Sequence, residues 1–448
     1  MIRLEERIKK PVGLSGTRTL VGFGFGPIQS GLFLYEAFQS GNFKRLVIDE
    51  IAPDVVKTIR EADGFFNINI ASNDRIDQVR IGPIEIYNPT SGIDDKNHLK
   101  EAIAEADELV TAVPSVTFYR SESEGSLQRV LAEGLIRKVE QGGPAAVIYT
   151  AENNNHAAEI LGDDVMSCVP NHLQESIKEK VQFLNTVIGK MSHVVIDLAE
   201  IQAGGLRTIT PNYQRAFLVE SFNRILISRI TLKSPFQRGI QVFEEKDNLL
   251  QFEEAKLYGH NASHALLGYI GALRSANLVH QVQEFAGVIP FVRDAFIMES
   301  GKPLISKYQD NDNLFTEEGF REFAEDLIAR MINPYLADSI DHVIRDPIRK
   351  LGWHDRLIGT MRLALSFGIP PMRYALGAAA ALAALDAEYI DSTRSSRLIL
   401  KEAWDEESVG VHDQESIISM IDQARDKLKV WRDSGYPDLQ RFFQDYTS

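Results

Sequence analysis

Short apolar runs alternate with longer stretches of helical spacing over the first 150 residues of the chain. The runs are rich in Val, Ile and Leu, as buried β-strands are, and they occupy residues 19–23, 45–49, 108–113 and 145–150. The intervening stretches repeat apolar residues as amphipathic helices do, at residues 32–38, 102–106 and 127–139. Strands that alternate with helices predict an α/β domain with a doubly wound parallel sheet of the Rossmann type.

The second half of the chain follows a different pattern. A mixed region, residues 185–238, contains β-type pieces at 194–196 and 216–219 and ends in a polar break at 244–248. Beyond that break the spacing is helical almost throughout. The predicted helices begin near Asn261 and continue at residues 317–332, 356–367, 373–385, 395–404 and 415–431, with a loop at 406–413. We therefore expect a dinucleotide-binding domain with extensions at residues 1–248 and a mainly α-helical substrate-binding domain at 249–448.

The first predicted strand stops at a glycine-rich turn. In a dinucleotide site the first glycine permits a tight turn, the second lets the backbone approach a pyrophosphate, and the N-terminus of the next helix attracts that anion. Gly24 and Gly26 take these two places, and Pro27 and Ile28 follow, so we assign all four to cofactor binding. The third glycine position carries Gln29. The alternative is a glycine-rich strand end of the kind that many α/β folds contain.

Polar and turn-forming residues follow the other predicted strands. Asp49 ends the second strand, where a carboxylate can accept hydrogen bonds from a ribose diol and repel a 2′-phosphate, so we expect NAD rather than NADP. Val113, Pro114 and Asn153 end or follow two further strands. The carboxyl ends of parallel strands meet at one edge, so these residues should border one crevice. Asn153 is the nearest asparagine to its strand end and is assigned to the substrate, although asparagines there also cap helices or form turns.

Lys256, Asn261 and His264 fall within nine residues, directly before an apolar helix. A lysine whose pKa is lowered by burial or by a nearby cation can take a hydroxyl proton, and an asparagine amide can bind the developing oxygen. On a straight helix Asn261 and His264 share a face, whereas Lys256 lies roughly 80° from His264. The three converge only if the helix starts near Asn261 or if Lys256 reaches across a cleft. A solvated lysine, an N-cap and a core histidine are the alternatives.

A metal site is not expected. His260 and His264 have the i, i+4 spacing of paired ligands, but no acidic third ligand is evident nearby. The chain has one cysteine, Cys168, which excludes an intramolecular disulfide and a multi-cysteine zinc site. The chemistry predicted for this stretch is therefore oxidation of an alcohol without zinc.

The charge balance restricts the partners. The formal net charge is −15, from 48 Lys and Arg against 63 Asp and Glu, which argues against nucleic acid and anionic membranes. An anionic ligand would need a local basic pocket. Arg345, Arg349 and Lys350 form such a cluster around Asp346 and Pro347, a pair typical of the start of a short helix. The cluster is either a phosphate clamp or a set of surface ion pairs.

Targeting signals are not apparent in the sequence. No apolar run reaches the ~20 residues of a membrane-spanning helix. Residues 1–10 are charged and lack the apolar segment of a secretory signal. We therefore expect a cytoplasmic protein without a membrane partner.

Taken with these residues, the sequence resembles the polyol-specific long-chain dehydrogenases. Their pattern of lysine, four residues, asparagine, two residues and histidine is present as Lys256, Asn261 and His264, with Asn153 in an Ala-Glu-Asn sequence. Residues 333–336 and 345–358 are similar to the phosphate-using branch, the mannitol-1-phosphate 5-dehydrogenases.

This resemblance implies a Rossmann domain, a helical substrate domain, NAD and no metal. It also implies Lys256 as the general base, Asn261 and Asn153 as oxygen-binding amides, and a histidine that hydrogen-bonds at position 264. The implied reaction interconverts a sugar-alcohol phosphate and a keto-sugar phosphate, mannitol 1-phosphate giving fructose 6-phosphate, in a monomer or weak homo-oligomer. Two alternatives are the same chemistry on an unphosphorylated polyol or a keto-uronate, and an NAD-binding sensor without catalysis, which the altered glycine turn suggests.

Overall fold

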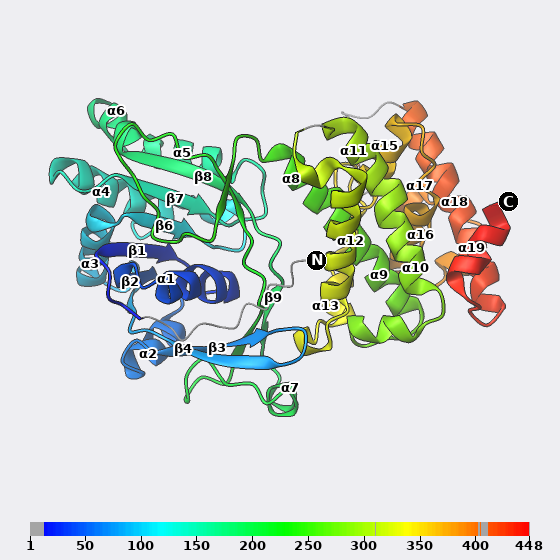
Figure 1. Ribbon diagram of the computed structural model, residues 1–448, viewed down its shortest axis with the longest axis horizontal. Coiled ribbons are helices and arrows are strands. Elements are labelled where there is room, and N and C mark those ends of the chain that lie inside the picture. Colours follow the sequence, from blue (N-terminus) through cyan, green and yellow to red (C-terminus); the bar gives the residue numbers. More distant parts are fainter. Residues whose placement is uncertain (1–12, 310, 402–403, 405–410, 448) are drawn as a thin grey trace. The chain divides into compact units, whose positions relative to one another are not determined.

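The computed structural model describes residues 13–309, 311–401, 404 and 411–447. The chain divides into two compact units, Met1–Leu249 and Leu250–Ser448, which we call unit 1 and unit 2. Each unit buries its own apolar side chains. Unit 1 combines strands with helices, whereas unit 2 is built of helices (Figure 1).

The main sheet of unit 1 has eight strands in the order β12-β11-β8-β7-β6-β1-β2-β5. The six strands from β8 to β5 are parallel, and β11 pairs antiparallel with β8. The strands are β1 (Arg18–Phe23), β2 (Phe43–Asp49), β5 (Glu85–Tyr87), β6 (Glu108–Thr111), β7 (Ala146–Thr150), β8 (Val181–Val187), β11 (Leu226–Ser228) and β12 (Glu244–Lys246). The strand order reverses between β1 and β6, which is where open α/β sheets bind ligands. The predicted Rossmann-type parallel sheet is confirmed.

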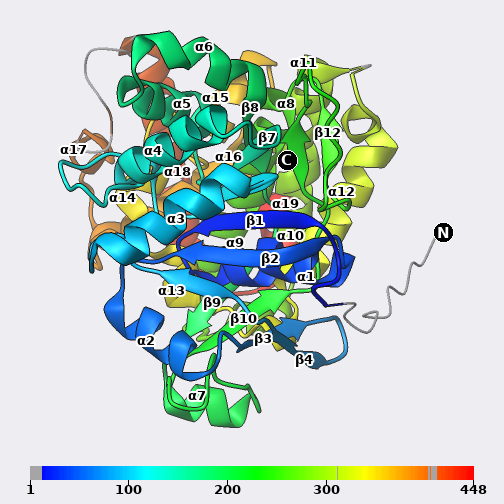
Figure 2. The ribbon, with the colours of Figure 1, turned by 90° about the vertical axis from the view of Figure 1, so that its left-hand side faces the viewer.

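Alternating side chains of β1 enter the cores on the two faces of this sheet. Leu20 belongs to one core and Val21 to the other, because successive residues of a strand point to opposite faces. The core of Val21 includes side chains of α3 (Ile93–Glu105) and α4 (Leu127–Glu140), which pack side by side (Figure 2). The other α-helices of unit 1 are α1 (Tyr35–Ser40), α2 (Pro53–Glu61), α5 (Ala157–Ser167), α6 (Asn171–Lys180) and α7 (Leu198–Ala203).

The core of Leu20 lies between the main sheet and a smaller one. The smaller sheet has the order β4-β3-β10-β9, and its strands are β3 (Phe66–Ala71), β4 (Ile76–Ile81), β9 (Ser192–Val195) and β10 (Ala216–Glu220). Phe25 packs edge-on against Phe66 of β3 and Phe217 of β10, at centroid distances of 5.0 and 5.6 Å. The glycine turn is therefore held from below by aromatic side chains of the smaller sheet.

Unit 2 is helical, as predicted. Its α-helices are α8 (Leu250–Glu254), α9 (Ala262–Leu273), α10 (Val288–Asp294), α11 (Lys302–Tyr308), α12 (Glu317–Met331), α13 (Ile340–Ile344), α14 (Pro347–Lys350), α15 (Ile358–Ser366), α16 (Met372–Leu385), α17 (Arg397–Leu400), α18 (Val411–Asp433) and α19 (Leu439–Thr447). Helices α9 and α16 pack together and bury nearly all their side chains. Glycine allows this approach, since a Cβ on Gly377 would lie 2.7 Å from Leu266 Cδ1. No helix in the described part of the chain is both long and apolar enough to span a bilayer.

Two local predictions toward the C-terminal end of unit 2 are wrong. The helix predicted over residues 395–404 is only α17, Arg397–Leu400. Its start is anchored by Ser396, whose backbone N–H donates to the Asp422 carboxylate at 3.0 Å, a contact that spacing does not reveal. The loop predicted at 406–413 ends earlier, because α18 begins at Val411. Residues 402–403 and 405–410 lie outside the described residues.

Candidate active site

The glycine turn after β1 has the geometry of a phosphate-binding loop. Gly24 has φ of 88°, and a Cβ there would lie 2.8 Å from the Ala112 carbonyl oxygen, so only glycine fits without strain. Its N–H donates to the Asp49 carbonyl oxygen at 2.8 Å, which ties the turn to the end of β2. A Cβ on Gly26 would meet no atom within 4 Å, so a ligand can approach the backbone here. Pro27 and Ile28 continue into the helix that follows.

The departure at Gln29 is matched by a glycine in the facing strand. Gln29 is fully buried at the start of a π-helical segment, Gln29–Leu34, in the place where a third glycine would let the helix approach the strand. A Cβ on Gly22 of β1 would lie 2.4 Å from Gln29 Nε2. In the usual motif a glycine in the helix leaves room for the strand. Here Gly22 in the strand leaves room for the Gln29 side chain of the helix.

Two acidic residues follow each other at the end of β2 and do different work. Glu50 accepts hydrogen bonds from the Phe25 and Ala52 N–H groups at 2.9 and 2.8 Å, so its carboxylate braces the glycine turn. Asp49 is buried, and no described residue donates a hydrogen bond to its carboxylate. Burial, and secondly the charge of Glu50, raise the pKa of Asp49 well above its ordinary value. A buried carboxylate without donors is suited to ligand hydroxyls.

Glu152 connects the ends of β6 and β7. Its carboxylate accepts hydrogen bonds from Val113 N–H and Thr111 Oγ1, both at 2.9 Å, and from the Tyr119 hydroxyl. Burial raises the pKa of Glu152, although these hydrogen bonds oppose the shift. The bonds fix Val113 and Pro114 on one strand end and Asn153, which is exposed, on the next. Glu152 escaped the sequence analysis, although it occupies the middle of Ala-Glu-Asn.

These strand ends fit a dinucleotide. Gly26 offers open backbone for a pyrophosphate, the segment beginning at Gln29 presents a helix N-terminus, and the Asp49 carboxylate is available to a ribose diol. The predicted cofactor residues of unit 1 therefore lie on three neighbouring strands, β2, β1 and β6.

In unit 2 the helix that carries Lys256 begins at Leu250, not near Asn261 as predicted. Helix α8, a π-helical turn at Ala255–Asn261 and helix α9 follow one another without a break. In a π-helix the hydrogen bonds join residues five apart, so Lys256 and Asn261 come closer to one face. The wide turn therefore reduces the angle of roughly 140° that would separate these two side chains on an α-helix. On a straight α-helix Lys256 and Asn261 would point in different directions, and the π-helical turn reduces that difference.

The environment of Lys256 favours its neutral form, which is the form that can accept a proton. Burial, and secondly the positive charge of Arg356, lower the pKa of Lys256 from 10.5 to about 8, while Glu253 opposes the shift. Arg356 is itself largely buried, and its Nε lies 2.8 Å from the Asp355 carboxylate. A neutral amine is thus accessible near neutral pH. Arg356 was part of a recognised sequence signature, but its effect on Lys256 depends on packing between distant segments.

The two histidines of the stretch differ. His264 Nε2 lies 3.3 Å from the Asp338 carboxylate. Burial alone would raise the pKa of Asp338, but His264 and His342 hold it below its ordinary value. His260 is buried with its ring stacked 6.0 Å from that of His264, and burial followed by the charge of His264 lowers its pKa well below 6.5. Within the described residues, no group of three or more His, Cys, Asp or Glu is arranged to hold a metal.

The predicted phosphate cluster is only partly gathered. Arg349 Nε lies 2.7 Å from the Asp346 carboxylate, and its Nη1 lies 3.4 Å from that of Asp355. Lys350 is buried and its ammonium donates to the Arg345 carbonyl oxygen. Burial, then Arg356 and Arg349, lower the pKa of Lys350 to about 8. Arg345 is exposed. Arg349 therefore forms ion pairs with carboxylates, which was the alternative to a phosphate clamp for this cluster.

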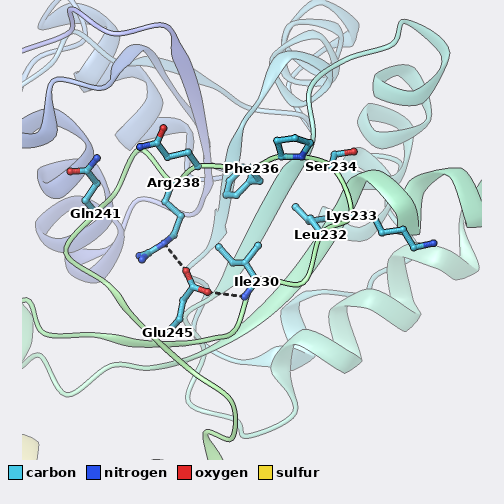
Figure 3. Close-up of a pocket in the computed structure, with 10 residues that line it drawn as sticks. Ile230, Leu232, Lys233, Ser234, Phe236, Arg238, Gln241 and Glu245 are labelled. Atoms are coloured by element: carbon cyan, nitrogen blue, oxygen red, sulfur yellow. Dashed lines mark hydrogen bonds and ion pairs between the residues drawn. The ribbon is translucent and has the colours of Figure 1, made fainter.

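A pocket in unit 1 lies apart from all these residues. It is enclosed by the segment from Ile230 to Glu245, as Figure 3 shows. Its charged groups are already engaged: Arg238 pairs with Glu245 at 3.4 Å, and the same carboxylate accepts from the Ile230 N–H at 3.0 Å. Its walls carry none of the predicted catalytic or cofactor residues. The strand ends in unit 1 and the π-helical turn in unit 2 therefore remain the candidate functional regions of their own units.

Family models match both halves of the chain. The mannitol dehydrogenase Rossmann domain matches residues 18–235, and the mannitol dehydrogenase C-terminal domain matches residues 248–423. The chain belongs to the mannitol dehydrogenase family. It is therefore an NAD-dependent polyol dehydrogenase, and the resemblance stated from the sequence is confirmed at the level of the family, the enzyme class and the cofactor.

Solved structures agree in fold. A D-sorbitol dehydrogenase in substrate-free form shares 14% identity and a TM-score of 0.73, with 94% of each chain covered. A Pseudomonas fluorescens mannitol 2-dehydrogenase, in a ternary complex with NAD and D-mannitol, shares 14% identity and a TM-score of 0.67, with 94% of this chain and 93% of that chain covered. This chain and these two enzymes thus share a fold.

Proposed function

We propose that this polyol dehydrogenase acts on a sugar-alcohol phosphate, mannitol 1-phosphate being converted reversibly to fructose 6-phosphate. The observation that carries the proposal is the position of Arg356, whose charge lowers the pKa of both Lys256 and Lys350. The basic cluster and the proposed base therefore lie in one electrostatic environment, within a chain whose net charge is −15. A substrate phosphate would be attracted there despite the repulsion of the whole chain.

The residues of unit 2 divide the chemistry between them. Lys256, as the neutral amine, accepts the proton of the substrate hydroxyl while the adjacent C–H leaves as hydride. The Asn261 amide donates a hydrogen bond to the same oxygen. His264, next to Asp338, orients the substrate or Lys256. We propose the same oxygen-binding role for Asn153. Bound NAD supplies the hydride acceptor.

The phosphate part is tested by comparing two substrates. Arg349→Ala should raise KM for mannitol 1-phosphate roughly 10- to 100-fold, since a charge-assisted contact of about 1.5–3 kcal/mol is lost, and leave mannitol nearly unaffected. Arg293→Ala is the matched control, because Arg293 forms an ion pair with Glu325 on the surface of the same unit. Equal effects on both substrates would reject the clamp.

The second candidate substrate is an unphosphorylated polyol. It is favoured by the ion pairs of Arg349 with Asp346 and Asp355. These two carboxylates offset the positive charge that would attract a substrate phosphate. In that case kcat/KM should be higher for mannitol than for mannitol 1-phosphate. Arg349→Ala should then leave KM unchanged for both substrates. A keto-uronate belongs to the same comparison, since its carboxylate would depend on the arginines as a phosphate does.

A further inference from the structure

The π-helical turn at Ala255–Asn261 is clasped by hydroxyl groups from other helices. Ser300 Oγ donates to the Tyr258 carbonyl oxygen at 2.6 Å, between Lys256 and Asn261 in the sequence. Thr360 Oγ1 lies 3.3 Å from the same oxygen. Ser300 and Thr360 are both fully buried. A π-helical turn is rare, and its hydrogen bonding is irregular, so outside contacts decide whether it persists.

Ser300 is the stronger of the two contacts. Thr360 has one hydroxyl proton, and that proton bonds the carbonyl oxygen of Arg356, four residues earlier in its own helix. Its distance to the Tyr258 oxygen is that of a shared, weaker contact. The hydroxyl of Ser300 has no competing acceptor that is closer, so it supplies the main side-chain bond to the turn.

The Ser300 bond extends into a chain of hydroxyls that returns to the same helix. Tyr374 Oη lies 2.7 Å from Ser300 Oγ and 2.9 Å from Ser263 Oγ. Because Ser300 donates to a carbonyl, the direction of the chain is fixed: Ser263 donates to Tyr374, and Tyr374 donates to Ser300. The hydroxyl chain begins at Ser263, two residues after Asn261, and ends at the Tyr258 carbonyl oxygen. It therefore connects the middle of the π-helical turn to the first residues of α9.

The position of Ser300 is itself built from a second wide turn. Ser300 belongs to a π-helical segment, Ala295–Gly301, that packs on the first one. A Cβ on Gly259 would lie 2.8 Å from Phe296, so the two segments approach as closely as glycine allows. The neighbouring Glu299 accepts hydrogen bonds from the Arg373 and Tyr374 N–H groups, at 3.0 and 3.1 Å, which places Tyr374 at the start of α16.

We propose that Ser300, with Tyr374 behind it, is a positioning residue for Lys256 and Asn261, holding the wide turn that brings the base and the amide toward one face. This inference rests on the proposed function of Lys256. Without the clasp the helix relaxes toward α-helical spacing, in which Lys256 and Asn261 diverge. Lys256 then moves away from Arg356 and from its buried surroundings, which together lower its pKa.

Two variants and a matched control test the proposal in the full chain. Ser300→Cys keeps the volume but replaces a strong donor with a weak one, and Tyr374→Phe removes the link between Ser300 and Ser263. Tyr389→Phe is the control: its hydroxyl is equally buried, and it bonds Ser396 at 2.6 Å in the same unit without touching the turn.

NADH formation is measured with mannitol 1-phosphate and with mannitol, across pH. Ser300→Cys should lower kcat roughly 10- to 100-fold, with KM changed less than threefold. It should also move the pH range over which kcat/KM increases to higher pH. Tyr374→Phe should shift it in the same sense by less, and Tyr389→Phe should leave it in place. Kinetics of Ser300→Cys equal to those of Tyr389→Phe would overturn the proposal.

A readout without substrate separates this inference from the proposed function. Amide hydrogen exchange of residues 255–263 should quicken at least tenfold in Ser300→Cys and stay unchanged in Tyr389→Phe. If the exchange quickens but Lys256→Met retains full activity, the turn is clasped as inferred and the role of Lys256 fails. If Lys256→Met is inactive and Ser300→Cys changes neither exchange nor kinetics, only the positioning role is lost.

Discussion

The candidate cofactor residues of unit 1 and the candidate catalytic residues of unit 2 are positioned in different ways. In unit 1 the cofactor residues sit at strand ends, and their work is done mostly by backbone: the turn at Gly24, the open approach at Gly26 and the N–H groups that Glu50 braces. In unit 2 the chemistry belongs to side chains, and their arrangement depends on one irregular turn and on charges from distant segments. A backbone site tolerates much variation around its glycines, whereas a side-chain site depends on every group that places it.

The largest expected effect is in unit 2. Lys256→Met should lower kcat for polyol oxidation about 10³-fold, because general bases contribute roughly 10²–10⁴-fold. NADH formation measures the rate, and NAD affinity, followed by fluorescence titration, should remain that of the wild type. A rate within tenfold of wild type would remove the assigned base and with it the contrast between the units.

The next largest effect is expected on stability, at Gly22 of unit 1, which faces the Gln29 side chain. Gly22→Ala should destabilise the protein by about 1–3 kcal/mol, because the new methyl group meets the Gln29 side chain. Adding Gln29→Ala should recover much of that loss, giving a coupling energy in a double-mutant cycle. Urea unfolding measures all four proteins. Additive effects would show that the two positions do not share the space.

A smaller effect is expected at the ribose position. Asp49→Asn should raise KM for NAD about tenfold, since an amide accepts the hydrogen bonds of a diol less well than a carboxylate does. Polyol KM should stay the same, which distinguishes this variant from Lys256→Met. Glu50→Gln is the informative companion: it should reduce stability as well as NAD affinity, because it loosens the bracing of the Phe25 N–H.

The mildest prediction is a displacement along the pH axis. The neutral form of Lys256 is the active one, so oxidation should increase with pH through a limb near pH 8. Arg356 repels a proton on Lys256, and its removal in Arg356→Met therefore raises that pKa and moves the limb to higher pH. Arg293→Met, which alters a surface ion pair, should not move it. A limb unchanged in Arg356→Met would mean that burial alone sets the pKa.

The sequence predicted the fold class of both units and the class of chemistry. It did not predict the smaller sheet, although β-type runs were predicted near β9 and β10. The strand–turn–helix pattern around Gly24 is local, and local patterns report backbone well, as the parallel sheet shows. The family was predicted from a resemblance and the cofactor from the glycine turn and Asp49, and the family models confirm the family. Substrate choice and the individual residue roles stay predictions.

Other parts of the site lay beyond the sequence for identifiable reasons. A π-helical turn leaves no periodic signature in a short apolar stretch, so the helix start was misplaced at Asn261. The lowered pKa of Lys256 depends on Arg356, which is 100 residues away along the chain. Glu152 and Ser300 act through hydrogen bonds to other segments, which side-chain type alone does not announce.

The pairing of Gly22 with Gln29 has an evolutionary consequence. A chain with glycine at both positions can gain a side chain at either one, but a gain at one forecloses the other, because both would fill the same space. The two positions should therefore vary in a mutually exclusive way among relatives. A search that demands the third glycine would pass over this branch, while one that accepts the glycine from the strand would recover it.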